Sequence, residues 1–397
     1  MIKLMNFFRT KKIFFDYASA TPMLPEAVRV MEKYYYKSFY NSGAIYSEAE
    51  EVKKDIEECR AKIARIVGAQ TKEIIFTSGG TESDNLAILG VLEKAFKEIK
   101  KPKLIISSIE HPAVFSVGEE WVRRGGSLSI VGVDNKGRVD MNEFKQNLNE
   151  EVALVSIGLV NSEIGVIQPI SKIGRMLKEM RRDNKSEYPL LHSDASAGAY
   201  LFNTNIESLQ CDLMTLDSAK IYGPKGVGIL ALRHGVEIHP MLFGGGQERG
   251  RRPGTLSPAL IAGMAKAMEI NEKDKERELK RVSKLRSIFL DIVSKKLPNS
   301  IINGPEIEIA PNILSITVPK VLGEFLVIKM EREGVLASVG SACSYDEKIS
   351  GSPVIRALGN GDYSESTIRF SFGRQTTLSS VKRGAEIFCR ISQNMVK

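Results

Sequence analysis

A lysine stands at the end of a short apolar run and just before a glycine–proline turn. Lys220 follows the apolar residues Leu213, Met214 and Leu216 and precedes Gly223-Pro224. A lysine that leaves a buried strand points into the cleft beside the turn, where burial weakens its preference for the charged form. Such an amine can form a Schiff base with an aldehyde cofactor. The alternative is a surface lysine beside a turn.

Two further polar residues follow apolar runs of the same kind. Asp194 closes the run at 190–193, and a carboxylate there can pair with a protonated pyridine nitrogen, which keeps that ring an electron sink. Capping of the next helix is the alternative for this residue. His111 also follows a strand-like run, and its imidazole could stack on a flat ring or move protons. A histidine satisfied within the core is the ordinary alternative.

Residues 77–83, Thr-Ser-Gly-Gly-Thr-Glu-Ser, lie where an expected strand gives way to a helix. Glycines allow close backbone approach, hydroxyls donate hydrogen bonds, and a helix N-terminus favours a phosphate. Gly80 and Thr81 are therefore candidates for holding a phosphate group, with a plain capped loop as the alternative. The segment lacks the Gly-Lys-Ser/Thr ending of a nucleotide P-loop.

Cys343 ends the motif Gly-Ser-Ala-Cys and opens a polar stretch that continues to residue 352. A cysteine in a polar loop is poorly explained as core filler, and exposure suits a nucleophile that must travel. Arg356 follows this stretch, and its planar guanidinium can hold a carboxylate. Together the two residues indicate a site in which a thiolate attacks the side chain of an amino acid.

The elements that must position these residues alternate between short apolar runs and helical patterns. Strands are expected at 74–76, 104–107, 128–131, 152–157 and 190–193, and helices at about 84–99, 114–123 and 173–182. Strands that alternate with helices predict a mainly parallel sheet covered on both faces. Ligands of such sheets bind beyond the carboxyl ends of the strands, which is where the candidate residues fall.

A long charged helix at about 261–295 leads into a second, smaller α/β region. That region contains expected strands near 313–318 and 368–372 and a terminal helix at about 379–395. We expect a large cofactor-binding domain at 16–262, and a small domain made of 1–15 and 263–397 that carries the cysteine loop. A chain of 397 residues agrees with two cores.

Composition restricts the possible function classes. Hydrophobic content of 43% and charged content of 26% are ordinary for a soluble protein. The net charge of +8 is spread along the chain without a basic, aromatic-rich patch, so we expect no direct nucleic-acid ligand. No run approaches the roughly 20 apolar residues that span a bilayer, and the N-terminus does not form a convincing signal peptide. We therefore expect a cytoplasmic protein without a membrane partner.

The 4 cysteines are widely spaced and include no Cys-x-x-Cys pair. This spacing argues against a disulfide framework and against a structural zinc site, and it suits a reducing compartment. No metal is expected.

In combination, these segments resemble the cysteine desulfurases, within the class V aminotransferase group of pyridoxal-phosphate enzymes. The resemblance covers nearly the whole chain, and its segments are weak singly but specific together and in this order. The Gly-Ser-Ala-Cys form with a long following loop is similar to the housekeeping branch, which serves iron–sulfur clusters and tRNA thiolation. The matching segments are 15–22, 78–85, 110–114, 163–165, 220–226, 244–250, 254–255, 340–343 and 368–371.

The resemblance implies the pyridoxal-phosphate-dependent transferase fold, which is aspartate aminotransferase-like, and a homodimer with active sites near the subunit interface. Lys220 would hold pyridoxal 5′-phosphate as a Schiff base. Asp194 would pair with the pyridine nitrogen of the cofactor, and His111 would stack on its ring. The implied phosphate contacts are Gly80, Thr81, Ser218 and, from the other subunit, Thr255.

The implied reaction converts L-cysteine to L-alanine. Cys343 would attack the substrate sulfur and keep it as a persulfide, while Arg356 would hold the substrate carboxylate and Asn161 would be a second substrate-binding residue. The persulfide would pass to an acceptor protein, either an iron–sulfur scaffold or a tRNA-thiolation enzyme. The alternative reaction is that of a selenocysteine lyase or another β-eliminating pyridoxal-phosphate lyase.

Several positions depart from the family pattern. Ser162 replaces an asparagine, and Ala197 replaces a glutamine expected near the cofactor ring. Asp217 and Ala219 replace a serine and a histidine that bind the phosphate, and Asp217 would repel a phosphate if it pointed the same way. Each lost hydrogen bond to a charged phosphate costs roughly 1.5–3 kcal/mol, so weaker cofactor binding is predicted. These losses motivate a third alternative, a degenerate homologue that binds partners without turnover, although the lysine, aspartate, histidine and cysteine of the site are all retained.

Overall fold

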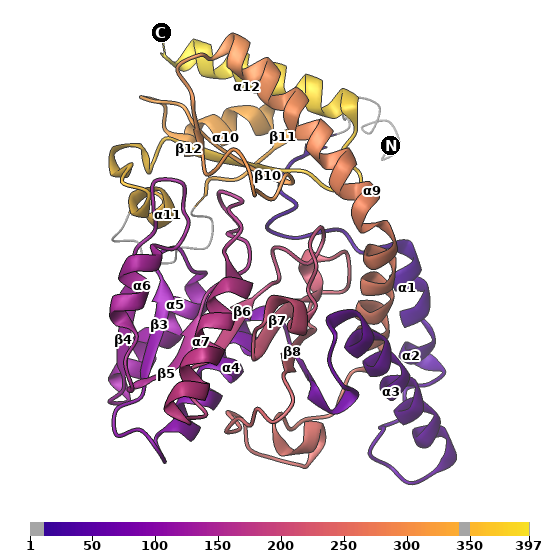
Figure 1. The fold of residues 1–397 in the computed structure, drawn as a ribbon. Helices are drawn as coiled ribbons and strands as arrows, with labels where there is room; N and C mark the ends of the chain where they lie inside the picture. Colours follow the sequence, from indigo (N-terminus) through magenta and orange to yellow (C-terminus); the bar gives the residue numbers. More distant parts are fainter. Residues whose placement is uncertain (1–11, 341–349, 397) are drawn as a thin grey trace.

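The computed structural model describes residues 12–340 and 350–396, and a 7-stranded sheet organises the larger part of them (Figure 1). The strand order is β2-β8-β7-β6-β5-β3-β4. Strand β8 runs antiparallel to both of its neighbours, and all other neighbours are parallel, which confirms the mainly parallel sheet. The strands are β2 (Ile74–Thr77), β3 (Lys103–Ser107), β4 (Ser127–Val131), β5 (Val152–Ser156), β6 (Leu190–Asp194), β7 (Leu213–Asp217) and β8 (Gly228–Leu232).

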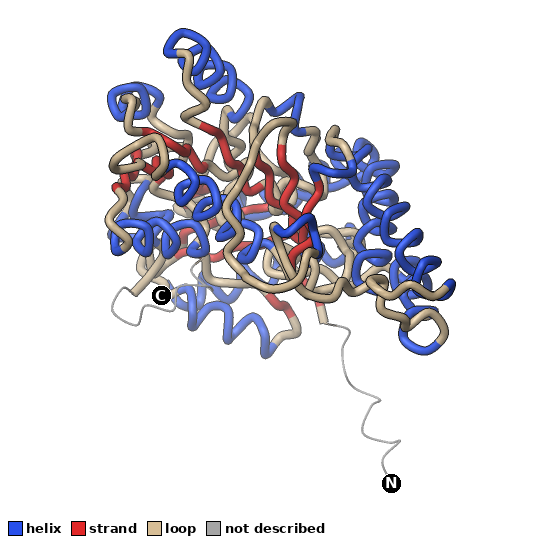
Figure 2. The backbone as a smooth tube through the Cα atoms, turned by 90° about the horizontal axis from the view of Figure 1, so that it is seen from below, coloured by secondary structure: helices blue, strands red, loops and turns tan. Residues whose placement is uncertain are grey.

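Helices cover both faces of this sheet, as Figure 2 shows from below. Alternate residues of a strand therefore enter different cores: Ile105 packs on one side, while Leu104 and Ile106 pack on the other. This two-sided burial explains why the strands are almost continuously apolar. One face receives α4 (Gly80–Ala95) and α5 (Pro112–Arg123), and the other receives α3 (Ser47–Val67), α6 (Met141–Asn147) and α7 (Ile170–Asn184).

A second, smaller sheet has the order β12-β10-β9 and is antiparallel. Its strands are β9 (Ile301–Asn303), β10 (Ile313–Thr317) and β12 (Thr367–Ser371), and its apolar residues pack with α10 (Gly323–Arg332) and α12 (Leu378–Val396). The expected strands near 313–318 and 368–372 are thus confirmed. A short parallel pair joins β1 (Ile13–Phe14) to β11 (Val335–Leu336), so the start of the described chain lies beside the small sheet.

Helix α9 (Pro258–Lys296) connects the two regions and confirms the long helix expected from the sequence (Figure 1). Its first part packs on the large core through Met264 and Met268, and its later part packs on the small core through Val282 and Phe289. The helix passes without interruption through the expected boundary between residues 262 and 263, so that boundary stays a prediction.

The remaining helices are short and mostly connect the larger elements. They are α1 (Pro25–Met31), α2 (Lys33–Tyr36), α8 (Ile206–Leu209) and α11 (Pro353–Ala357).

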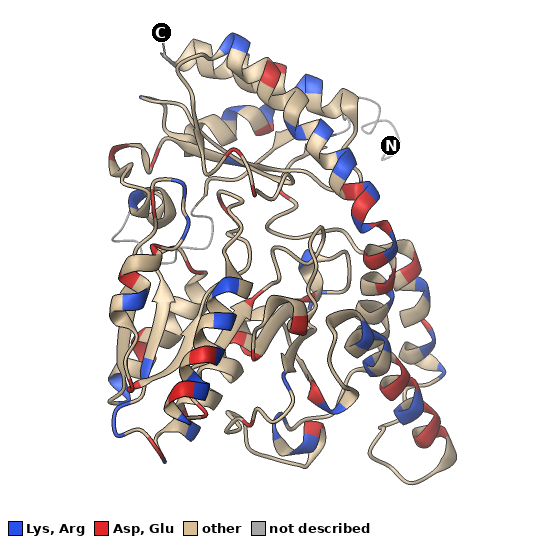
Figure 3. Cartoon of the chain, viewed as in Figure 1, with Lys and Arg blue, Asp and Glu red and all other residues tan. Residues whose placement is uncertain are grey.

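Basic and acidic side chains are interspersed along the same helices, most visibly on α9 (Figure 3). Neighbouring turns pair them, as between Lys273 and Glu269 and between Arg281 and Glu278. Within the two described ranges, no helix is long and apolar enough to cross a membrane.

Candidate active site

Four of the candidate residues meet at one edge of the large sheet because each follows the carboxyl end of a strand. Gly80 opens α4 after β2, and His111 is the N-cap residue of α5 after β3. Asp194 is the last residue of β6, and Lys220 lies in the single turn after β7. The strand order places β6 and β7 side by side, so Asp194 and Lys220 come from adjacent strands.

The amine of Lys220 donates hydrogen bonds to two backbone carbonyls of the N-terminal segment. Its Nζ lies 2.9 Å from the oxygen of Ala18 and 2.8 Å from that of Ser19. Thr21 holds this segment in place, because both its N–H and its hydroxyl donate to the carbonyl of Ala219, over 3.0 and 2.8 Å. The lysine side chain also lines a small cavity with Tyr17, Tyr200, Tyr222 and Asn312.

The ring of His111 is oriented by the backbone of its own helix. Its Nδ1 accepts a hydrogen bond from the N–H of Ala113 over 3.2 Å, so a neutral ring carries its proton on Nε2. Neighbouring atoms exclude water from part of the ring, and this desolvation lowers the pKa of His111. The positive charge of Lys220 acts in the same direction, while the negative charges of Asp194 and Asp217 partly oppose the shift. The uncharged form of the imidazole is therefore favoured.

Two carboxyl groups that interact with Asp194 have raised pKa values. Burial raises the pKa of Asp84 well above its usual value and that of Glu110 to about 7, and repulsion from Asp194 adds to both shifts. Glu110 also accepts hydrogen bonds from the hydroxyl of Ser107 and from the N–H of Gly158. Asp194 itself accepts from the N–H of Ser196 over 2.9 Å.

Carboxylates of the chain itself occupy the glycine-rich loop that was expected to bind a phosphate. The N–H of Gly80 donates to Oδ2 of Asp217 over 3.2 Å, and the N–H of Ser78 donates to Oε2 of Glu82 over 2.7 Å. Arg252 pairs with the same Glu82, with distances of 2.7 and 3.2 Å between nitrogen and oxygen. Thr81 is exposed at the start of α4.

The buried hydroxyls of Ser218 and Ser196 lie in different surroundings, one against Gly223 and the other near Gly80. Ser218 is fully buried, and a Cβ atom on Gly223 would lie 2.1 Å from its hydroxyl oxygen, so this serine packs against Gly223. Ser196 is 5% exposed, and its hydroxyl oxygen is 3.7 Å from the position of a Cβ atom on Gly80. Neither hydroxyl has a hydrogen-bond partner among the residues that the structure describes. Sequence reasoning missed Ser196, whose only signal was its place two residues after Asp194.

The remaining expected site residues have local hydrogen-bond partners or are exposed. The amide of Asn161 closes a turn, since its oxygen accepts from the N–H groups of Glu163 and Ile164 over 2.9 and 3.0 Å. Arg356 is exposed on α11 and donates to the carbonyl of Ser350. Thr255 is exposed in the loop before α9.

Cys343 lies outside the described residues. The remaining cysteines are Cys59, Cys211 and Cys389, and burial raises the pKa of each of these thiols. None of these three is prepared as a nucleophile, because the thiolate is the reactive form.

Arg369 is a buried arginine. It belongs to the matching segment 368–371, but no role was predicted for it from the sequence. Its Nη2 donates to Oδ1 of Asp16 over 2.8 Å and to the hydroxyl of Ser19 over 2.7 Å. Its Nη1 donates to the carbonyl of Ser162 over 3.2 Å, while its Nε is buried without an acceptor in the described part of the chain. The carbonyl of Ser19 also accepts a hydrogen bond from Lys220, so the guanidinium and the lysine contact the same residue. A charged residue within the apolar strand β12 was the signal that could have identified it.

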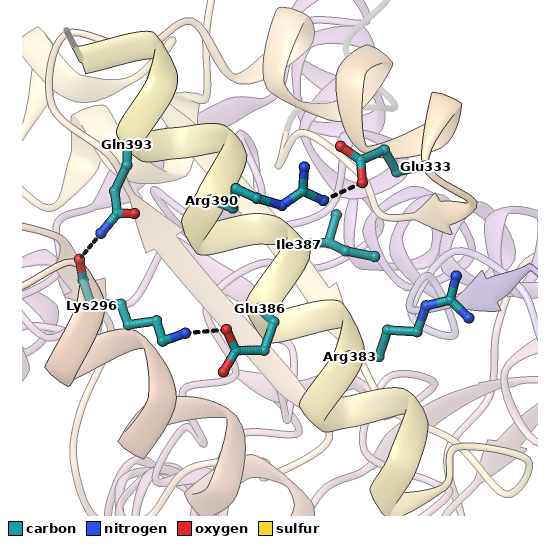
Figure 4. A pocket seen from close by; sticks show the side chains of 7 residues that line it. All are labelled: Lys296, Glu333, Arg383, Glu386, Ile387, Arg390 and Gln393. Carbon is teal, nitrogen blue, oxygen red and sulfur yellow. Dashed lines mark hydrogen bonds and ion pairs between the residues drawn. The ribbon is translucent and has the colours of Figure 1, made fainter.

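A surface groove of about 460 Å³ lies away from this edge, between the end of α9 and α12 (Figure 4). Its polar side chains contact one another: Lys296 pairs with Glu386, Arg390 pairs with Glu333, and Gln393 donates to the carbonyl of Lys296. None of the candidate residues that the structure describes lines this groove.

Comparisons with known proteins agree with this geometry. The family model described as aminotransferase class V matches residues 13–383. The chain is 36% identical to a protein of Dictyoglomus turgidum named cysteine desulfurase IscS, with 97% of this chain and 95% of that protein covered. It is also 36% identical to a mitosomal cysteine desulfurase of Encephalitozoon cuniculi, with 94% and 84% covered.

Solved structures are similar over the same length. One described as a NifS-like protein superposes with a TM-score of 0.87 at 30% identity, covering 97% of this chain and 99% of the other. Another, described as SspA in complex with cysteine, has a TM-score of 0.76 at 28% identity, with 91% and 99% covered.

Proposed function

The chain belongs to the class V aminotransferase family and is a cysteine desulfurase that uses pyridoxal 5′-phosphate, and we propose that Lys220 holds the cofactor while Cys343 takes the sulfur. The observation that supports the role of Lys220 is its meeting with Asp194 and His111 at one edge of the sheet. In this reaction, L-cysteine becomes L-alanine and its sulfur remains on Cys343.

The residues at this edge fit the ring end of the cofactor. Lys220 supplies an amine for the aldehyde, Asp194 supplies a carboxylate for the pyridine nitrogen, and the neutral imidazole of His111 supplies a flat face for stacking. When bound, the cofactor supplies an electron sink for bond cleavage next to the α-carbon of an amino acid. The phosphate end fits less well, because the N–H of Gly80 already donates to Asp217.

For the substrate carboxylate we propose Arg369 as the anchor. Asp16 and Ser19 hold its guanidinium at the segment that contacts Lys220. Its buried Nε–H has no acceptor among the described residues, so this group is available to a carboxylate. A planar guanidinium binds a carboxylate through two parallel hydrogen bonds. Arg356, the residue expected from the sequence, stays a prediction, and its exposed position on α11 supports it less.

We further propose a homodimer. Large apolar side chains are strongly exposed, including Tyr36 at 64%, Phe39 at 65%, Ile45 at 95% and Phe243 at 81%. Exposed apolar patches typically mark protein interfaces, and a second copy of the chain is the partner that the family implies. In such a dimer the exposed Thr255 would reach the phosphate site of the other subunit.

The acceptor of the sulfur is proposed to be an iron–sulfur scaffold or a tRNA-thiolation enzyme, in the cytoplasm. The motif Gly-Ser-Ala-Cys, typical of the housekeeping branch, supports this proposal, and so does the name of the relative from Dictyoglomus turgidum.

The test is to purify the chain with added cofactor and to measure alanine and sulfide from L-cysteine in the presence of dithiothreitol. Cys343→Ser is expected to retain the visible absorbance of the bound cofactor and to lose both products. The matched control is Cys59→Ser, which removes a half-buried thiol with a raised pKa and should leave turnover unchanged. A Cys343→Ser variant that still makes sulfide, or a wild type that makes no alanine, would overturn the proposal. A strong preference for selenocysteine would favour the lyase alternative.

A further inference from the structure

Asp217 fills the acceptor position at the N-terminus of α4. Its Oδ2 accepts from the N–H of Gly80 over 3.2 Å, and its Oδ1 accepts from the N–H of Ala219 over 2.8 Å. A Cβ atom on Gly80 would lie only 3.3 Å from Oδ2, so the carboxylate lies directly against the glycine backbone. The chain thus supplies its own anion at this site.

The surroundings are suited to an anion with more oxygens than this carboxylate has. Helix α4 has 16 residues, and its N-terminus attracts negative charge. Gly79 adopts φ 154°, a conformation that residues with a side chain rarely take. The hydroxyl of Ser196 is buried, lies 3.7 Å from the Cβ position of Gly80, and has no partner within the described ranges. This orphan hydroxyl is a second donor at the same place.

The arginine attached to the start of α4 does not pair with Asp217. Arg252 is the basic residue attached to the start of α4, and both of its bonds there go to Glu82. Ala219 contributes only its backbone N–H. A phosphate that enters this site therefore finds the N–H of Gly80 already bound to a carboxylate. Two like charges at such short range repel each other.

We propose that Asp217 competes with the phosphate of the cofactor for the N–H of Gly80, so that the phosphate contributes little to cofactor affinity in this chain. The inference rests on the proposed function, because it requires that Lys220 holds the cofactor. Asp217 then controls cofactor affinity, and the hydroxyl of Ser196 donates a hydrogen bond to the phosphate once Asp217 has moved.

The test compares pyridoxal 5′-phosphate with pyridoxal, which lacks the phosphate, by titrating the full chain and following the visible absorbance of the bound compound. In the wild type the two dissociation constants should differ by less than about tenfold, the effect of one typical hydrogen bond. Asp217→Asn retains the shape and an acceptor oxygen but removes the charge. It should tighten the binding of pyridoxal 5′-phosphate by about tenfold or more and leave that of pyridoxal unchanged.

Asp140→Asn is the matched control, because Asp140 caps α6 through the N–H groups of Asn142 and Glu143 in the same manner. It should leave both constants unchanged. Asp217→Ser serves as a second variant with the same expected gain, and Ser196→Ala in the Asp217→Asn background should reverse part of that gain.

A wild type that binds pyridoxal 5′-phosphate over a hundredfold more tightly than pyridoxal would overturn the inference and leave the proposed function intact. The inference would also be overturned if the ratio of the two dissociation constants in both Asp217 variants equalled that of the wild type. If the wild type and both variants take up neither compound, the cofactor role of Lys220 is wrong, and the inference fails with it.

Discussion

The Nη2 atom of Arg369 lies 2.8 Å from Oδ1 of Asp16, although 353 residues separate the two in the sequence. Their side chains are only 6% and 23% exposed. This ion pair joins the last strand of the small sheet to the segment whose carbonyls accept from Lys220. It therefore sets the position of the proposed carboxylate anchor relative to the proposed cofactor lysine.

Replacing Arg369 by lysine should raise the KM for L-cysteine by about tenfold or more, because an ammonium group retains the charge but loses the two parallel hydrogen bonds. Steady-state alanine production over a range of cysteine concentrations measures this effect. The matched control is Arg356→Lys, which should leave KM unchanged. The opposite result, with KM raised only in Arg356→Lys, would support the residue expected from the sequence instead.

Glu163 should contribute a loss of stability to the folded chain as the pH rises from about 4.5 to 7. The hydroxyl of Ser352 donates to this buried carboxyl over 2.5 Å, and burial raises the pKa of Glu163 from 4.5 to about 7. In that window the folded state binds more protons than the unfolded state, so each pH unit costs up to about 1.4 kcal/mol. The contribution is complete below the unfolded pKa and is lost as the pH passes the folded pKa.

Urea unfolding at pH 5 and pH 8 measures this dependence. Glu163→Gln retains an acceptor for Ser352 and should reduce the loss of stability between the two pH values by on the order of 2–3 kcal/mol. Glu110→Gln should act in the same direction, since burial raises the pKa of Glu110 to about 7 as well. If the loss in Glu163→Gln equals that of the wild type, the assignment to this group is wrong.

Breaking the ion pair between Arg60 and Glu248 should be strongly destabilising. The two side chains are 3% and 1% exposed and form two bonds of 2.8 and 2.7 Å. Arg60→Met leaves a buried charge without its partner, which typically costs about 3–5 kcal/mol, measured as the free energy of unfolding in urea. Because the pair of Lys295 with Asp291 is 71% and 60% exposed, Lys295→Met should cost less than about 1 kcal/mol. Equal effects of the two substitutions would contradict this prediction.

Gly340 should not tolerate a side chain. A Cβ atom there would lie 2.0 Å from Oε1 of Glu163, so the buried carboxyl or the backbone must move. We expect Gly340→Ala to lower the free energy of unfolding by about 1–3 kcal/mol. It should also reduce sulfide release, because Gly340 lies three positions before Cys343. Gly361→Ala is the control, since a Cβ atom there meets nothing within 4 Å. A Gly340→Ala variant as stable as this control would show that the contact is relieved at no cost.

Much of the fold follows from local patterns in the sequence. Strands buried on both faces must be apolar and short, and the helices between them must bury one side, so the alternation from Ile74 onward predicts a mainly parallel sheet. The same logic places Asp194 at the carboxyl end of one strand and Lys220 just after another, and the structure has these two strands, β6 and β7, side by side. A side chain's place along its own strand is a local property, and the sequence records it.

Contacts between distant segments were decided only by the tertiary structure. Asp217 reaches Gly80 across 137 residues, and Arg369 reaches Ser19 across 350. These distances depend on strand order and on how the small sheet packs against the N-terminal segment, neither of which any local pattern encodes. The sequence by itself therefore determined the reaction class and the residue types at the sheet edge. The packing of the two regions decided which arginine lies beside Lys220 and that a carboxylate occupies the N-terminus of α4.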